Sequence, residues 1–169
     1  MSTLDSPYHH GDLRAALLDQ ADALLDAGGD GAVSLREVAR AAGVSATAAY
    51  RHFADKESLL AALAARHYAE FGQILAGAPL AEMGRAYIRF ALARPGRFRL
   101  MFGPLLAHAG AHPDLAAASG AAFAALSAAA PSPDDALRAW GLVHGLAHLL
   151  LDGAVRPPDV DALVARLIA

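Results

Sequence analysis

Residues 34–53 read SLREVARAAGVSATAAYRHF, and this stretch decides the fold. Ser34 lies three residues before Glu37, which is the pattern of a capping box at the start of a helix. Gly43 then ends the first apolar stripe, and Ser45 can cap a second short helix. Two short helices joined by a tight glycine turn are typical of a helix-turn-helix, whose second helix enters the DNA major groove.

Helical periodicity continues on both sides of this stretch. Upstream, apolar residues recur at three- and four-residue steps from Asp12 until Gly28 and Gly29. Downstream, Asp55 can cap a helix over 56–76, and prolines mark the ends of the helices that follow. We expect those further helices at 80–94, 97–107, 113–130, 134–152 and 157–168. No alternating strand pattern of useful length occurs, so the sequence predicts an all-α protein of about nine helices.

Composition excludes several classes of protein. The chain of 169 residues is 18% charged and 56% hydrophobic, which argues against disorder. It has no cysteine, so disulfides, thiolate catalysis and cysteine-ligated metal sites are excluded. Neither a secretory signal nor a membrane span is visible, and we expect a cytoplasmic protein. No glycine-rich phosphate loop or Gly-x-Ser-x-Gly elbow occurs, so we expect no enzyme activity and no cofactor.

Two histidine pairs leave metal binding as an alternative. His144 and His148 are four residues apart, as are His108 and His112, and this spacing puts each pair on one face of a helix. No glutamate accompanies either pair in a His-Glu-x-x-His arrangement, and no acidic residue lies between the members of a pair. We therefore expect no metal site.

Four strings carry a resemblance to a known family. Residues 35–39, 42–45, 49–53 and 55–60 read LREVA, AGVS, AYRHF and DKESLL. With their order and spacing, residues 11–63 resemble the DNA-binding domain of the TetR family of transcriptional regulators. The YHHG string at residues 8–11 is similar to one branch of that family.

The second half of the chain resembles a C-terminal domain type named for a Trp-His-Gly signature. Here the signature would be Trp140, His144 and Gly145, and the string PGRFRLMFG at residues 95–103 is similar to the mid-region motif of that domain. The resemblance implies a three-helix DNA-binding head and a helical domain for effector binding and dimerisation. We place the head at residues 1–55 and the second domain at residues 56–169.

The resemblance also implies how the head would contact DNA. The second helix of the helix-turn-helix would enter the major groove. We expect phosphate contacts from Tyr50, His52 and Lys56, and base contacts from Arg36 and Thr47. The complete set, with the residues that flank this helix, is Arg36, Ser45, Ala46, Thr47, Tyr50, Arg51, His52 and Lys56.

Several basic side chains have a structural alternative to DNA contact. Arg36 and Arg40 lie on a solvated face, and either can pair with Glu37 or an aspartate. Arg51 can pair with Asp55, four residues further along the chain.

The head is not basic as a whole. Residues 1–56 carry five Lys or Arg and eight Asp or Glu, which weakens the attraction of phosphates. This charge balance keeps one alternative open, a helical interaction protein that has lost specific DNA binding. The leading prediction is a homodimeric DNA-binding repressor that binds a palindromic operator and is released by a small-molecule effector.

Helices between residues 60 and 150 are expected to enclose the effector pocket. Ligand pockets are mostly apolar with a few placed polar groups, and the aromatic and histidine residues of this region fit that description. The same residue types at helical spacing are also typical of a plain hydrophobic core, and both interpretations stay open. The candidates are Phe71, Tyr87, Phe90, Phe98, Met101, Phe102, Trp140, His144 and His148.

The helices expected at 134–152 and 157–168 are the predicted dimer interface. Gly141 and Gly145 are four residues apart and would let another helix approach closely. The alternative is that they pack against the helix at 113–130 of the same chain. The helix at 56–76 would link the head to the pocket and transmit effector binding.

Overall fold

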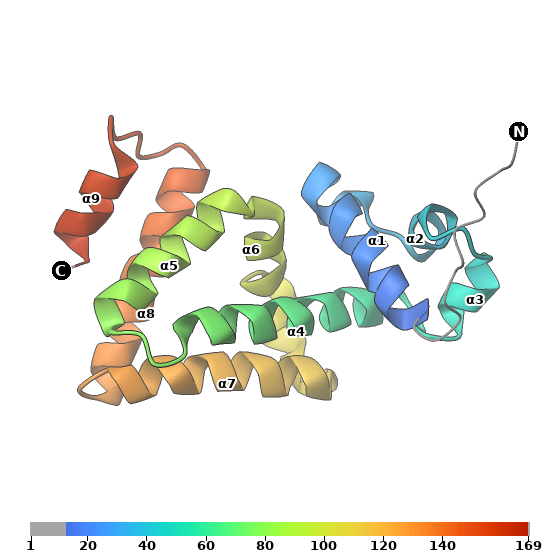
Figure 1. Cartoon of the computed structure of the whole chain (residues 1–169), viewed down its shortest axis with the longest axis horizontal. Coiled ribbons are helices and arrows are strands. Elements are labelled where there is room, and N and C mark those ends of the chain that lie inside the picture. Colours follow the sequence, from blue (N-terminus) through green and yellow to red (C-terminus); the bar gives the residue numbers. More distant parts are fainter. Residues whose placement is uncertain (1–12, 169) are drawn as a thin grey trace, which may run out of the picture.

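The structure is a computed structural model that describes residues 13–168. Over these residues the chain forms nine α-helices and two short 3-10 helices, with no strand (Figure 1). The predicted all-α fold is therefore confirmed. The YHHG string and the predicted start of the first helix at Asp12 lie outside the described residues.

Three helices make up a head at one end of the molecule (Figure 1). They are α1 (Leu13–Gly28), α2 (Leu35–Ala41) and α3 (Ala46–Tyr50), and a 3-10 turn η1 (Asp30–Ala32) follows α1. Gly29 ends α1 at φ +70°, a left-handed conformation that favours glycine. Leu17, Val38 and Ala49 are fully buried, one from each helix, so the three helices share one core.

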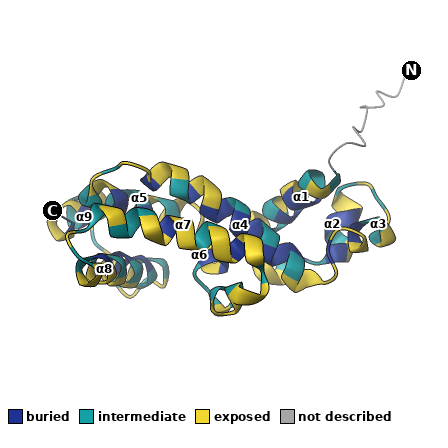
Figure 2. Cartoon of the chain, turned by 90° about the horizontal axis from the view of Figure 1, so that it is seen from below, coloured by how far each residue is buried: buried dark blue, intermediate teal, exposed yellow. Residues whose placement is uncertain are grey.

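A long helix, α4 (Lys56–Leu75), runs from the head into the body of the protein (Figure 1). It begins with a capping box: the Ser58 backbone N–H donates to the Asp55 carboxylate at 2.7 Å, and the Asp55 N–H donates to the Ser58 hydroxyl at 3.1 Å. Helix α7 (Pro113–Ala129) lies alongside α4. Figure 2 shows buried residues along α4, whereas the outer sides of α7 and α8 carry exposed ones.

The remaining helices complete the body of the protein (Figure 1). They are α5 (Leu80–Ala93), α6 (Pro95–Met101), η2 (Pro104–Ala111), α8 (Pro133–Leu151) and α9 (Val160–Leu167). Helix α5 packs against α8, and α6 packs against both α1 and α4. Helix α6 therefore contacts the head and the body together.

Two predicted helices differ from the structure by more than one residue at an end. The helix expected at 97–107 is divided into α6 and η2, because Gly103 is followed by Pro104, which has no N–H to donate. A Cβ at Gly103 would lie 2.3 Å from the Arg99 carbonyl oxygen, so only glycine fits this break. The helix expected from residue 157 begins at Val160 instead, after Asp159, whose carboxylate accepts from the Ala162 N–H at 2.9 Å.

Among the described residues, no single helix is long and apolar enough to cross a membrane. Helices α7 and α8 meet that test only as a pair, by length and composition, and they are bent by 113° at the break between them.

Candidate DNA-binding surface and effector pocket

The helix-turn-helix is held by two serine caps and one glycine turn. The Ser34 hydroxyl accepts from the Glu37 backbone N–H at 3.1 Å, and the Ser45 hydroxyl accepts from the Ala48 N–H at 3.2 Å. Between the two helices, Gly43 has φ +69°, a conformation that non-glycine residues rarely adopt. The turn predicted from the sequence is therefore built as expected, with each serine starting a helix.

The capping box predicted at Ser34 is only half formed. The Glu37 carboxylate does not reach back to the Ser34 N–H but accepts from Arg40 Nε at 3.1 Å. Arg40 therefore pairs with Glu37, which is the structural alternative to DNA contact given for it above. The pairing of Arg51 with Asp55 is not observed among the described residues. The Asp55 carboxylate instead caps α4.

Most of the predicted DNA contacts are exposed to solvent. On α3, Ala49 is fully buried while the Tyr50 side chain is 48% exposed. The other exposed candidates are Arg36, Ser45, Thr47, Arg51, His52 and Lys56, and Ala46 is half-buried. Lys56 Nζ also donates to the Asp30 carbonyl oxygen at 2.6 Å, which joins the start of α4 to the turn after α1. An ammonium has three donors, so this bond leaves two for another acceptor.

A cavity of about 570 Å³ lies in the body between α4, α5, α7 and α8. This volume is within the range of about 300–1,000 Å³ that holds drug-sized ligands. Of the candidates, Phe71, Tyr87, Phe102 and Trp140 line it. The exposed large apolar residues at its wall are Phe123, at 45%, and Leu142 and Leu167, each at 46%. These three residues mark the opening of the cavity to solvent.

The other pocket candidates lie away from the cavity wall. Phe98 and Met101 on α6 are fully buried, in the core that α6 shares with its neighbours. Phe90 packs on the outer side of the wall, with its ring 5.1 Å from that of Phe71. His144 lies behind Tyr87, and the His148 ring is 4.7 Å from the His144 ring. None of these five residues lines the cavity. Helical periodicity identifies buried residues, but it does not distinguish a cavity wall from a packed core.

The polar groups at the wall of the cavity are joined to protein groups. The Tyr68 hydroxyl donates to the Met101 carbonyl oxygen at 2.8 Å, and the Tyr87 hydroxyl lies 2.8 Å from His144 Nδ1. Burial raises the pKa of both tyrosines above the ordinary value. Burial also lowers the pKa of His144, and the neighbouring His148 lowers it further. Both tyrosines and His144 are therefore neutral near pH 7.

The histidine pair is not joined by a third possible metal ligand in the described part of the chain. Within residues 13–168, no group of three or more His, Cys, Asp or Glu side chains is placed to hold a metal ion. His144 instead makes its contact with the Tyr87 hydroxyl.

Two family models match the sequence, one over the head and one over most of the body. The model for bacterial regulatory proteins of the tetR family matches residues 17–63, and a tetracyclin repressor-like C-terminal domain matches residues 80–169. The chain belongs to the TetR family. It is accordingly a ligand-responsive transcriptional regulator with an N-terminal DNA-binding head.

Solved structures with the same fold cover nearly the whole chain. A protein of unknown function from Rhodococcus sp. RHA1 is 32% identical, with a TM-score of 0.81, over 96% of this chain and 94% of that one. A TetR transcriptional regulator from Rhodococcus sp. RHA1 is 24% identical, with a TM-score of 0.65, over 92% of each chain. The multidrug binding protein EbrR, in complex with proflavin, is 22% identical, with a TM-score of 0.62, over 92% of this chain and 99% of that one. A search of curated proteins finds no match.

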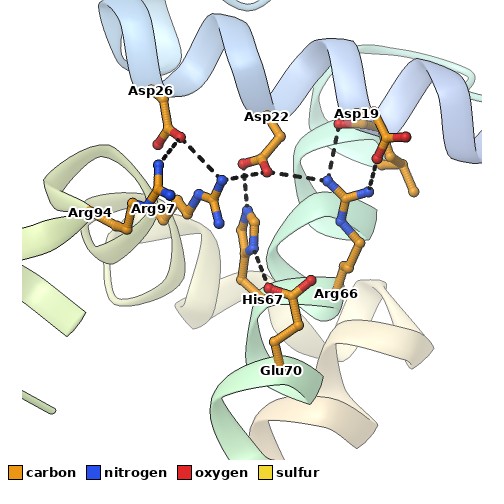
Figure 3. Close-up of polar contacts among 9 residues, drawn as sticks. Asp19, Asp22, Asp26, Arg66, His67, Glu70, Arg94 and Arg97 are labelled. Atoms are coloured by element: carbon orange, nitrogen blue, oxygen red, sulfur yellow. Dashed lines mark hydrogen bonds and ion pairs between the residues drawn. The ribbon is translucent and has the colours of Figure 1, made fainter. Parts of the chain in front are cut away.

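In this TetR-family chain, a cluster of ion pairs joins the head to the body (Figure 3). Asp22 points from α1 toward Arg97 of α6, whose Nη2 lies 2.7 Å from the carboxylate. The same carboxylate faces two residues of α4, with His67 Nε2 at 2.9 Å and Arg66 Nη2 at 3.4 Å. His67 Nε2 and the Asp22 carboxylate lie within ion-pair distance, but their relative orientation does not form a hydrogen bond. One carboxylate thus connects three helices.

Two further aspartates of α1 extend this cluster. Asp19 Oδ1 lies 2.6 Å from Arg66 Nη1, and Asp26 Oδ2 lies 2.8 Å from Arg94 Nη1 and 3.1 Å from Arg97 Nη2. The sequence analysis did not identify this cluster. The aspartates' spacing of three and four residues, which places them on one helix face, is the signal that could have identified the cluster.

The outer face of α8 carries three exposed leucines, together with the exposed Arg138, which pairs with Asp135. Leu137, Leu142 and Leu149 are 60%, 46% and 46% exposed. Gly141 and Gly145 share this face, and a Cβ at either glycine would meet no atom within 4 Å. The alternative in which these glycines pack against α7 of the same chain is therefore not the observed arrangement.

Proposed function

We propose that this chain is a homodimeric repressor that binds a palindromic operator and releases it when a small molecule occupies the body cavity. In this proposal it acts in the cytoplasm as a regulator and not as an enzyme. The observation that carries the proposal is the exposed Tyr50 on α3, a helix whose opposite side is buried through Ala49. An aromatic that is left half in solvent on a short, capped helix is available to a ligand outside the chain.

The proposed DNA contacts divide into two kinds. Tyr50, His52 and Lys56 donate to phosphates, and Arg36 and Thr47 reach base edges. Arg51 is exposed and has no acidic partner in the described part of the chain, so its charge adds to the attraction of phosphates. The head is proposed to end at residue 55, where the Asp55 cap starts α4.

The proposed effector site is the cavity in the body. Its volume and apolar wall suit a small organic molecule, and the EbrR complex with proflavin provides an example of such a ligand in a protein of the same fold. A ligand that favours one arrangement of the two heads over another shifts the balance between bound and free operator.

Operator binding is tested by fluorescence anisotropy with the DNA upstream of the gene, over a series of salt concentrations. We expect that a Tyr50→Ala, Lys56→Ala double variant binds about tenfold or more weakly, with a salt slope reduced by about one for each lost cation contact. Arg89→Ala is the control, because this exposed arginine lies on α5 of the body. Weak binding that is equal for operator and scrambled DNA, and equal in the double variant, would favour the interaction protein instead.

Dimerisation is tested through the apolar face of α8. We expect that Gly145→Glu weakens the dimer about tenfold or more, because it places a charge in a helix interface that admits only small residues. The variant chain should fold, since a Cβ at residue 145 meets no atom within 4 Å. Gly72→Glu is the matched control on α4, where the space around the Cβ is equally open. Sedimentation equilibrium measures the dimer dissociation constant of both variants. A Gly145→Glu protein that stays dimeric would show that another face forms the interface.

A further inference from the structure

We propose that the body cavity selects an uncharged and largely apolar ligand and discriminates against anions and cations of the same size. The inference rests on the proposed function, in which this cavity is the effector site. It adds a chemical class that the fold alone does not specify, because it follows from the particular side chains at the wall.

The first observation is the absence of charge at the wall. Among residues 13–168, none of those that line the cavity is Asp, Glu, Lys, Arg or His. His144, whose Nδ1 lies 2.8 Å from the Tyr87 hydroxyl, has its pKa lowered chiefly by burial. A charged ligand would lose its water shell without gaining an opposite charge, which is strongly unfavourable in an apolar environment.

The second observation is that the hydroxyls of the wall have partners inside the protein. Tyr68 donates to the Met101 carbonyl oxygen at 2.8 Å, and Ser119 donates to the Leu115 carbonyl oxygen at 2.7 Å. The Tyr87 hydroxyl lies 2.8 Å from His144 Nδ1. A ligand that needs a donated hydrogen bond from Tyr68 or Ser119 would have to break these bonds, whereas an apolar ligand leaves them intact.

The third observation is the aromatic surface that an apolar ligand would contact. Phe123 and Trp140, with ring centroids 5.8 Å apart, lie at the cavity, and Phe123 is also one of the residues at its opening. Rings at such distances offer faces and edges to a further aromatic ring. Trp140 is the only tryptophan of the chain, so its fluorescence reports occupancy of the cavity without a label.

The test compares probes that share a framework and differ in charge. N-phenyl-1-naphthylamine is uncharged, and 8-anilinonaphthalene-1-sulfonate has the same rings with a sulfonate added. Proflavin serves as the cationic probe. Titrations of the full chain at pH 7, followed by Trp140 quenching, are expected to give a dissociation constant for the uncharged probe about 100-fold lower than for either charged one.

A pair of variants ties binding to the cavity. Gly120 lines the cavity on α7, and a Cβ at this position would meet no atom within 4 Å. Gly120→Leu adds a large side chain at the exposed part of the cavity wall while replacing glycine by a better helix former, so the fold should be kept. We expect it to weaken binding of the uncharged probe at least about tenfold. Gly72→Leu makes the same change on α4 away from the cavity and should leave binding unchanged.

The outcomes separate this inference from the proposed function. Equal or tighter binding of the sulfonate or of proflavin, or no binding of the uncharged probe, would overturn the ligand class. Binding of the uncharged probe that Gly120→Leu leaves intact would overturn the assignment to this cavity. If the uncharged probe binds as expected but operator affinity does not change when it is present, the proposed effector response fails while the ligand class stands.

Discussion

Replacement of Asp22 by alanine is expected to lower the free energy of unfolding by about 3 kcal/mol. Only 14% of the Asp22 side chain is exposed, and its carboxylate contacts Arg97, His67 and Arg66 from two other helices. Removal of the carboxylate leaves partly buried guanidinium groups without a full set of partners, which costs more than the loss of one surface ion pair. Urea denaturation followed by circular dichroism measures the change.

Asp19→Ala is the matched control for this prediction. Asp19 lies three residues earlier on α1 and contacts Arg66 at 2.6 Å, but its side chain is 67% exposed. Exposed ion pairs contribute about 1 kcal/mol or less, so this variant should stay close to the parent protein. Similar losses in the two variants would mean that Asp22 acts as a surface charge and that the cluster does not hold the head to the body.

Stability is expected to decrease as the pH falls from about 7 to 5.5, by up to about 1.4 kcal/mol per pH unit for each histidine that resists protonation. Burial lowers the pKa of His67, and Arg97 lowers it further, against the opposing effect of Asp22 and Glu70. The folded chain therefore takes up this proton at a lower pH than the unfolded chain, whose histidine pKa is about 6.5. Acid favours the state that binds more protons, which below this value is the unfolded one.

The contribution of His67 is isolated by comparing unfolding free energies across this pH range in His67→Gln and the parent. The pH dependence should become shallower in the variant, because glutamine does not titrate. His144→Gln is a useful second comparison, since burial lowers the pKa of His144 in the same direction. A parent protein whose stability is constant or increases on acidification would contradict the prediction.

The start and end signals of helices were the most predictable part of the fold. Ser45 and Asp55 cap the helices that they were expected to cap, because a cap depends on residues only three positions apart. The η2 segment was missed, since its residues have helical periodicity and the break depends on the close approach at Gly103. Local signals thus located the helices more reliably than their irregular connections.

The candidate sites were less predictable because they depend on how helices face one another. Met101 and Phe102 are neighbours on the chain, yet Phe102 lines the cavity and Met101 is in the packed core. The partners of Asp22 lie on α4 and α6, more than forty residues away, and no local pattern pairs them. Exposure of Tyr50 could be anticipated, since the motif itself defines which side of α3 is buried.

The ion-pair cluster in Figure 3 also bears on the acidity of the head. Asp19, Asp22 and Asp26 are neutralised by arginines of α4, α6 and the turn between α5 and α6, all of which follow residue 55. The charges of the head are therefore balanced by side chains that lie beyond the proposed domain boundary. A head separated from the body would expose three uncompensated carboxylates and repel phosphates, so the body supplies part of the charge balance that DNA binding requires.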